Sequence, residues 1–296
     1  MQYGFSIKRK CYLLSVLLMT VWLTGCVQEE FESTPSPAGN GIRFTLTVPD
    51  VNLPSVSSRT MTGTGTAKKE DEIETVDILV FDMSKTPAVF LEWVSATGVT
   101  QDLADNSTVS FSAVLSPTTA STCIVVVANK ELDNIVSGFT KGATTKVEAM
   151  EKMLHTQTGK WLADGSTTGG YTRIPMYGEK VISKITPSMD PITGINMKRM
   201  LARIDIRNNS VTSNFTVEEV YLANYNTTGY IAPAWNTNGQ VTEPAPDTPV
   251  LPTGSGKMTE EGDAIRYSVN GNTLYDGEIY TFESLAAEDA GGAGQD

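Results

Sequence analysis

Apolar and polar residues alternate in the first patterned stretch of the chain, from Gly41 to Val48. A period of two predicts a β-strand with one buried face, made here by Ile42, Phe44, Leu46 and Val48. Pro49 ends the pattern, because proline lacks the N–H that a strand ladder needs. Residues 50–71 are rich in serine, threonine and glycine, and their first basic residue is Arg59. We expect an edge strand followed by a long loop that a protease can cut.

Further apolar stretches predict a mainly β body from residue 73 to about residue 206. They are residues 73–82, 89–94, 109–115, 123–128 and 171–180. The stretch 123–128 is continuously apolar, which is typical of a central strand buried on both faces. Residues 187–196 are predicted to form a turn-rich connection, and residues 197–206 a strand with Arg199 and Arg203 on its polar face. The two arginines could form an anion site, but in so acidic a chain we favour pairing with acidic side chains or shielding of the strand surface.

One helix is predicted in this body. Thr145 and Glu148 form a capping-box pattern, and Gly159 can end the helix. Its apolar face is made by Val147, Met150 and Leu154. His155 falls on the predicted helix and is the single histidine of the chain. Because a metal site needs several ligands, we interpret His155 as a packing or surface residue.

Residues 207–296 are predicted to form a second β domain, after a first domain of residues 41–206. About five strands are predicted there, from the apolar stretches 215–222, 229–232, 265–269 and 274–282. Asn270-Gly271 is a strong hairpin signal, and Asp276-Gly277 predicts a second turn. A closed β-sandwich usually has about seven strands. Either another polypeptide completes this domain, or the sequence continues beyond Asp296.

The chain is acidic, with 34 aspartate and glutamate residues against 22 lysine and arginine residues and a formal net charge of −12. An acidic surface repels phosphate backbones, so nucleic acid is not an expected partner. The three cysteines exclude a disulfide scaffold, and Cys123, in an apolar run, is expected to pack as a small hydrophobe. The sequence has no nucleophile elbow, histidine pair, metal-ligand spacing or phosphate loop. Neither an enzyme nor a cofactor or metal is predicted.

Residues 1–25 have the pattern of a secretion signal, with basic residues 8–10 before an apolar run too short to span a bilayer. The signal ends in Leu23-Thr24-Gly25-Cys26, which looks like a bacterial lipobox. That likeness implies cleavage between Gly25 and Cys26 and acylation of Cys26, which would hold the chain on a membrane. The alternative is an ordinary signal with a chance cysteine. Residues 26–40 have prolines but no periodicity and are expected to form a tether.

Several stretches together resemble one family, the fimbrillins, which are the pilins of type V pili of Gram-negative anaerobes. The resemblance begins with the lipobox at Cys26 and the strand from Ile42 to Val48 with its arginine loop. It continues in Val125-Val126-Val127-Ala128-Asn129, Ile174-Pro175-Met176-Tyr177-Gly178 and Arg199-Met200-Leu201-Ala202-Arg203-Ile204-Asp205-Ile206. Together these stretches cover most of residues 1–285.

The resemblance implies two tandem transthyretin-like β-sandwich domains, with one short helix in the first and an incomplete second. It also implies a lipoprotein precursor held in the outer membrane by Cys26 and cut by an arginine-specific protease. The matching cut lies between Arg59 and Thr60. Loss of strand 41–48 would open a groove worth on the order of 10 kcal/mol, and a strand from another copy or a related pilin would fill it. The chain would then be a fimbrial subunit that serves adhesion to a host or bacterial receptor.

Two other functions stay open. The first is a monomeric surface lipoprotein, or an anchor or terminal pilus subunit, that binds a glycan or a host protein through exposed aromatic residues. The candidates are Trp161, Tyr230 and Trp235, although such residues more often pack in a core. The second is an enzyme, which the sequence motifs do not support.

Overall fold

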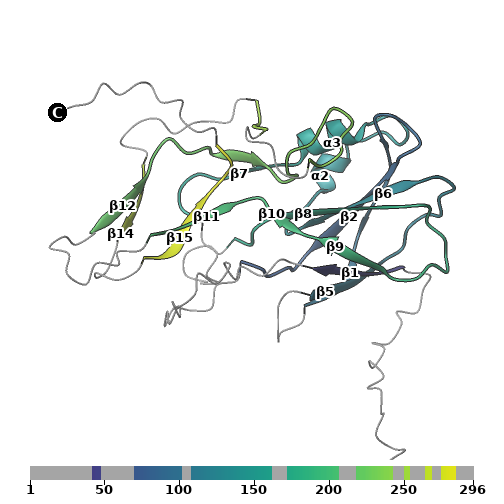
Figure 1. Cartoon of the computed structure of the whole chain (residues 1–296), viewed down its shortest axis with the longest axis horizontal. Helices are drawn as coiled ribbons and strands as arrows, with labels where there is room; N and C mark the ends of the chain where they lie inside the picture. The colour runs from purple at the N-terminus through teal and green to yellow at the C-terminus, as the bar shows by residue number, and fades with distance from the viewer. Residues whose placement is uncertain are drawn as a thin grey trace, which may run out of the picture. The chain divides into compact units, whose positions relative to one another are not determined.

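The computed structural model describes residues 42–47, 70–101, 108–161, 172–206, 218–242, 250–253, 264–268 and 275–284. Over these residues the fold is mainly β, which confirms the predicted class (Figure 1). The helices are α2 (Asp133–Val136) and α3 (Lys146–Lys152). The strands are β1 (Ile42–Thr47), β2 (Val76–Asp82), β3 (Val89–Ser95), β4 (Thr97–Gln101), β5 (Thr108–Ala113), β6 (Thr122–Ala128), β7 (Leu154–Thr156), β8 (Met176–Ile182), β9 (Ile192–Asn196), β10 (Lys198–Arg199), β11 (Ala202–Ile206), β12 (Glu219–Leu222), β13 (Thr228–Tyr230), β14 (Ile265–Ser268) and β15 (Tyr275–Thr281).

Two larger sheets pack face to face. The four-stranded sheet has the order β4-β5-β1-β9, and the five-stranded sheet has the order β10-β8-β6-β2-β3. The first hydrophobic cluster lies between them and combines β1 and β5 residues with Ile78 and Val80 of β2 and Ile124 and Val126 of β6. Two sheets joined by such a shared apolar layer form a β-sandwich.

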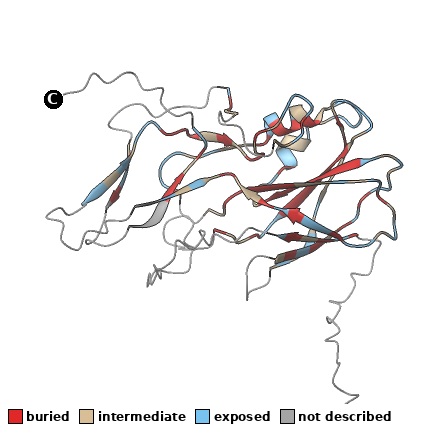
Figure 2. Cartoon of the chain, viewed as in Figure 1, coloured by how far each residue is buried: buried red, intermediate tan, exposed pale blue. Residues whose placement is uncertain are grey.

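Strand β6 is the centre of the five-stranded sheet, as its continuous apolar run predicts. All seven of its residues are buried, and it pairs antiparallel with β2 on one side and β8 on the other. Because side chains alternate along a strand, Ile124 and Val126 enter the first cluster while Val125 and Val127 enter a second one. Figure 2 shows this buried strand in red, inside the sandwich.

The second cluster covers the other face of the five-stranded sheet. It includes Met150 of α3, and also Ile231, Tyr280 and Phe282 from much later in the chain. Figure 1 shows α2 and α3 on this side of the sheet, opposite β1, β5 and β9. The cluster therefore joins residues from both sides of the predicted boundary at 206/207, and the division into two domains stays a prediction.

Helix α3 begins as predicted but ends earlier. The hydroxyl of Thr145 accepts from the Glu148 amide, and the Glu148 carboxylate accepts from the Thr145 amide, which completes the capping box. The helix ends at Lys152, so the prediction that Leu154 and His155 belong to it is wrong. Both lie in β7, which pairs antiparallel with β13. This pairing over residues 228–230 replaces the last predicted helical turn, and the amide of Ile231 donates to the carbonyl of Met153 at 2.9 Å.

The stretch 187–206 also differs from its prediction. Residues 192–196 form β9 instead of a loop, with Ile192 and Ile195 buried on either side of Gly194, whose φ is +70°. A bulge here breaks the alternation that would have signalled a strand. The predicted single strand 197–206 is split into β10 and β11, because the chain changes partner from β8 to β15 around Met200.

The remaining pairs are two-stranded. Strand β12 pairs with β14 and β11 with β15, both antiparallel. The turn predicted at Asp276-Gly277 is wrong, since β15 runs continuously through these residues and the β11 pairing shifts its register beside them. A third cluster of Tyr225, Ile265, Tyr267 and Ile279 lies in this part of the chain. Within the described ranges, no helix is both long and apolar enough to cross a membrane.

The close approach of β8 to the strand opposite generates a stability prediction. A Cβ at Gly178 would lie 2.7 Å from Met197 Sδ, 2.8 Å from Ile195 Cγ2 and 3.0 Å from the Asn196 carbonyl oxygen. We expect Gly178→Ala to lower the free energy of unfolding by about 1–3 kcal/mol through overpacking. Gly138→Ala is the control, because its Cβ meets nothing closer than 3.7 Å. Urea unfolding measures both, and equal stabilities of the two variants would contradict the packing account.

Candidate functional site

Strand β1 is the best candidate for a functional element, because the sandwich is built around it. Its side chains alternate as predicted: Ile42, Phe44 and Leu46 are only 4%, 1% and 0% exposed, while Arg43 and Thr47 are exposed. All three apolar side chains belong to the first cluster. Full burial of such side chains contributes about 1.5–3 kcal/mol each, so the apolar face of β1 contributes roughly 5–9 kcal/mol.

The contacts of β1 come from two strands with opposite directions. Strand β5 runs antiparallel to it and strand β9 runs parallel to it. Phe44 lies opposite Phe111, and the two rings stack with centroids 5.0 Å apart and an angle of 7° between their planes. We call the surface that receives β1 the β1 site. It is defined by Val109, Phe111 and Ala113 of β5 and by Ile192 and Ile195 of β9.

The position of β1 corrects one expectation. The sequence suggested an edge strand, whereas β1 lies inside its sheet between β5 and β9. The sequence pattern of residues 42–48 does not show that β1 has a second neighbour. That neighbour is β9, whose alternation of apolar and polar residues is broken by the bulge at Gly194. Adjacent strands are about 4.8 Å apart, so removing β1 would leave two facing strand edges separated by roughly 10 Å. That gap is the width of one strand.

The other predicted processing residues fall elsewhere. Val48, Arg59, Thr60, Gly25 and Cys26 all lie outside the described residues. Their roles in strand release, proteolysis and lipidation therefore stay predictions. The described chain resumes at Glu70, immediately after the loop that the sequence predicts around Arg59.

Of the two arginines of the 197–206 stretch, Arg203 pairs with an acidic side chain, as the composition favours, and Arg199 bonds to a backbone carbonyl oxygen. Arg203 Nη1 lies 2.9 Å from Glu70 Oε1, and Arg199 Nε donates to the Glu70 carbonyl oxygen at 3.0 Å. An anion site at these arginines is therefore not supported by their geometry.

The aromatic candidates for ligand binding are not arranged as one exposed platform. Trp161 is 3% exposed, packs in the second cluster, and donates from Nε1 to the Thr172 carbonyl oxygen at 2.9 Å. Tyr230 and Trp235 are half-buried and pack edge to face with centroids 4.9 Å apart. The reading of Trp161 as an exposed binding residue is thus wrong, because its ring is part of the core.

Cys123 and His155 have environments that suit packing. Burial raises the pKa of the Cys123 thiol to about 12, so the thiol stays protonated and a poor nucleophile. His155 contacts the Trp161 ring at 4.9 Å between centroids. Its burial, with the nearby charge of Lys130, lowers the pKa of its imidazole to about 4. In the described part of the chain, no group of three or more metal-ligating side chains is close enough to hold an ion.

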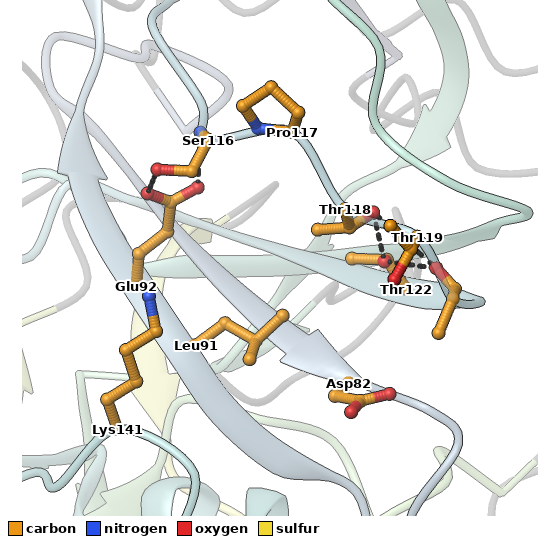
Figure 3. A pocket seen from close by; sticks show the side chains of 10 residues that line it. Asp82, Leu91, Glu92, Ser116, Pro117, Thr118, Thr119, Thr122 and Lys141 are labelled. Carbon is orange, nitrogen blue, oxygen red and sulfur yellow. Dashed lines mark hydrogen bonds between the residues drawn. The ribbon is translucent and has the colours of Figure 1, made fainter.

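A pocket of about 230 Å³ lies beside the strands β2 and β3 and the turn after β5 (Figure 3). Its polar groups bond mainly to one another. The Glu92 carboxylate accepts from both the amide and the hydroxyl of Ser116 at 2.7 Å, and the Thr118 and Thr122 hydroxyls are 2.9 Å apart. None of the described residues lining it is aromatic, so it offers no stacking surface for a sugar ring. The pocket is a weaker candidate than the β1 site.

Residues 42–245, more than half of the chain, match the family model described as Major fimbrial subunit protein (FimA). The match begins at the first residue of β1 and includes the whole β1 site. Among curated proteins, none matches the chain at a significant level.

Three solved structures have a distant likeness to the chain. A fimbrial assembly protein from Parabacteroides distasonis ATCC 8503 is 13% identical, with a TM-score of 0.40 and coverage of 84% of this chain and 79% of that chain. A protein from the same organism named for cell adhesion is 17% identical, with a TM-score of 0.43 and coverage of 85% and 73%. A Bacteroides thetaiotaomicron VPI-5482 protein named for polysaccharide binding is 12% identical, with a TM-score of 0.34 and coverage of 64% and 60%. These likenesses are too distant to indicate what the chain binds.

The stacking of Phe44 on Phe111 predicts a large effect of a core substitution in β1. Phe44→Ala should lower the free energy of unfolding of the uncut chain by about 3–5 kcal/mol, because it leaves a cavity in the first cluster. Arg43→Ala, on the exposed face of the same strand, should change it by no more than about 0.5 kcal/mol. Equilibrium unfolding in urea measures both values. Similar losses for the two variants would mean that β1 is not seated as described.

The environment of His155 predicts a pH dependence of stability. Its pKa is about 4 in the folded chain against an ordinary value of 6.5, so the unfolded chain binds the extra proton first. The stabilisation by neutral His155 is complete above pH 6.5 and is lost as the pH falls towards 4. Melting temperatures of the native chain and of His155→Gln should therefore converge over this range on acidification. Parallel curves from pH 7 to pH 4 would contradict the depressed pKa.

Proposed function

The chain belongs to the family of the Major fimbrial subunit protein (FimA), and we propose that it is a structural subunit of a cell-surface fimbria in which a strand of another subunit replaces β1. Membership of this family gives the coarser role, which is that of a pilus or adhesion protein. Our proposal adds three finer steps to this role, which are lipid anchoring, cleavage and strand replacement.

The observation that supports strand replacement most directly is the place of β1 in its sheet. A segment with three buried apolar side chains lies between two strands, and residues 48–69 are its covalent link to the body that follows. The free energy of unfolding of a domain is typically about 5–15 kcal/mol. Burial of the apolar face of β1 alone contributes a free energy of similar size. A body without β1 is therefore under strong pressure to take up another strand, and strand addition is a common mode of recognition between proteins.

Proteolysis supplies a reason for the exchange to proceed. While β1 is part of the chain, it rebinds its site intramolecularly, at an effective concentration on the order of millimolar for a flexible linker. After a cut behind Arg59, β1 is a separate peptide that is lost on dilution. A strand from a neighbouring subunit then competes for the β1 site with a peptide that no longer has the high effective concentration of an attached strand. The partners in this proposal are an arginine-specific protease and other copies of the chain or related pilins.

The order of the predicted sites along the sequence couples release from the membrane to this exchange. Cys26, β1 and Arg59 follow one another, so one cut between Arg59 and Thr60 separates the body from both the lipidated end and β1. In the proposal, the uncut precursor is held in the outer membrane by the lipid on Cys26 and is kept monomeric by its own β1. The cut subunit joins the fimbrium, where adhesion to a host or bacterial receptor takes place.

Analysis of native fimbriae tests this proposal. Subunits from fimbriae should begin at Thr60 and lack Ile42–Thr47, and Arg59→Ala should leave the chain uncut, membrane-bound and absent from fimbriae. Lys85→Ala, in the turn after β2, is the control and should leave assembly unchanged. N-terminal sequencing and mass spectrometry of purified fimbriae provide the measurement. Fimbriae whose subunits still contain β1 would overturn the strand-replacement proposal.

A further inference from the structure

Glu70, the first described residue after the loop that contains Arg59, is held by distant parts of the chain. Its side chain is almost completely buried, with 3% of the residue exposed. The carboxylate accepts from Arg203 Nη1 at 2.9 Å and from the Tyr280 hydroxyl, and the carbonyl oxygen accepts from Arg199 Nε at 3.0 Å. These partners are 133, 210 and 129 residues away in the sequence. Strands β10, β11 and β15 therefore all hold this one position.

The backbone that follows Glu70 is held by two amide side chains. Gln101 accepts from the Ile73 amide at 3.1 Å and donates to the Asp71 carbonyl oxygen at 2.8 Å. Asn129 has a φ of +59°, accepts from the amide of residue 74 at 3.0 Å, and donates to the carbonyl oxygen of residue 72 at 2.8 Å. We call residues 70–74 the anchor segment.

An ion pair adds to these contacts. Arg173 lies 3.3 Å from the Glu72 carboxylate and 2.7 Å from the Glu74 carboxylate. Glu74 is well exposed, with 61% of its side chain accessible, so this pair is screened by solvent and contributes little. The buried carboxylate of Glu70 is the stronger point of attachment, because hydrogen bonds to a charged group strengthen when water is excluded.

The polar partners named above lie outside β1. They belong to β4, β10, β11 and β15, to the turn after β6 and to the residues before β8. Within the anchor segment, Ile73 shares the first cluster with β1. Departure of β1 would therefore weaken one apolar contact of the segment and leave its polar attachments in place.

We propose that Glu70 limits how far a peptidase can trim the chain once the loop has been cut. It holds the start of the body to β11 and β15, so that trimming from a start such as Thr60 stops before β2. The inference rests on the proposed function for its context, because a cut in the loop is what exposes a new chain start. Exopeptidases need a free, extended chain end, and residues become available to them only when they detach from the fold. Among the described residues that follow the loop, Glu70 is the first, and its detachment breaks a buried, charge-assisted contact.

The experiment uses the full chain, cut with trypsin and then treated with a broad-specificity aminopeptidase. Trypsin can cut after Arg59, Lys68 or Lys69, and the sequence has no further lysine or arginine before Lys85. Whichever start results, aminopeptidase trimming of the native chain should stop at or before Glu70. Intact-mass spectrometry reads the remaining start to single-residue resolution.

Variants locate the limit at Glu70. Glu70→Ala should let trimming pass residue 70 at least about tenfold faster than in the native chain, because digestion follows the population of the detached segment. Glu70→Gln keeps the size of the side chain and should have an intermediate effect, as should Tyr280→Phe, which removes the partner hydroxyl. If Glu70→Ala does not fold, these two milder variants show whether the contacts of Glu70 limit trimming. Glu74→Gln is the matched control and should stop where the native chain stops.

Several results would overturn the inference. The first two concern the native chain, and they are trimming beyond residue 70 and resistance of residues 48–69 to trypsin. The other two concern the variants. They are trimming of the Glu70 variants at the same rate as the native chain, and an effect of Glu74→Gln as large as that of the Glu70 variants. The assay reads only the start of the cut monomer. Failure of cut subunits to form fimbriae would therefore count against strand replacement but not against the anchor, and trimming past residue 70 would do the reverse.

Discussion

The sandwich depends on the burial of one short strand between two others that are remote in sequence. Strands β5 and β9 are neighbours in their sheet only through β1, whose three apolar side chains complete the first cluster. The contact consists of backbone ladders and alternating apolar side chains, and neither demands covalent continuity with the body. A segment held in this way is central to the fold, and the proposed replacement needs only another strand with the same alternation of apolar side chains.

The rest of the body is joined by contacts that do not involve this strand. Buried Lys146 bonds to Glu179 at 2.6 Å and to the Gly239 carbonyl oxygen at 2.7 Å, and so links α3, β8 and a late turn. Arg203 links β11 to Glu70. In a chain with net charge −12, these cations lie at joints between distant segments. Loss of one partner from a buried pair destabilises strongly, so such joints favour one arrangement of the segments.

Sequence reasoning succeeds where a local pattern agrees with the tertiary fold. The run at 123–128 and the capping box at Thr145 are such cases, as are the buried positions of β1. It fails where pairing with a distant segment decides the structure. Leu154 and His155 leave the helix because residues 228–230 pair with them, and a bulge at Gly194 hides β9. The role of Glu70 is also invisible in the sequence, because its partners lie more than a hundred residues away. A buried glutamate among surface-like acidic neighbours has no local signature.

The mixed pairing of β1, antiparallel to β5 and parallel to β9, makes its site directional. An incoming strand that runs the same way as β1 restores both ladders with their original hydrogen-bond geometry. A strand that runs the opposite way must pair parallel with β5, where β1 pairs antiparallel. It must also pair antiparallel with β9, where β1 pairs parallel. In the proposed fimbria, successive subunits joined through such a site would all point in one direction. A fibre assembled in this way would have polarity. Its two ends would differ chemically, and subunits could add to them at different rates.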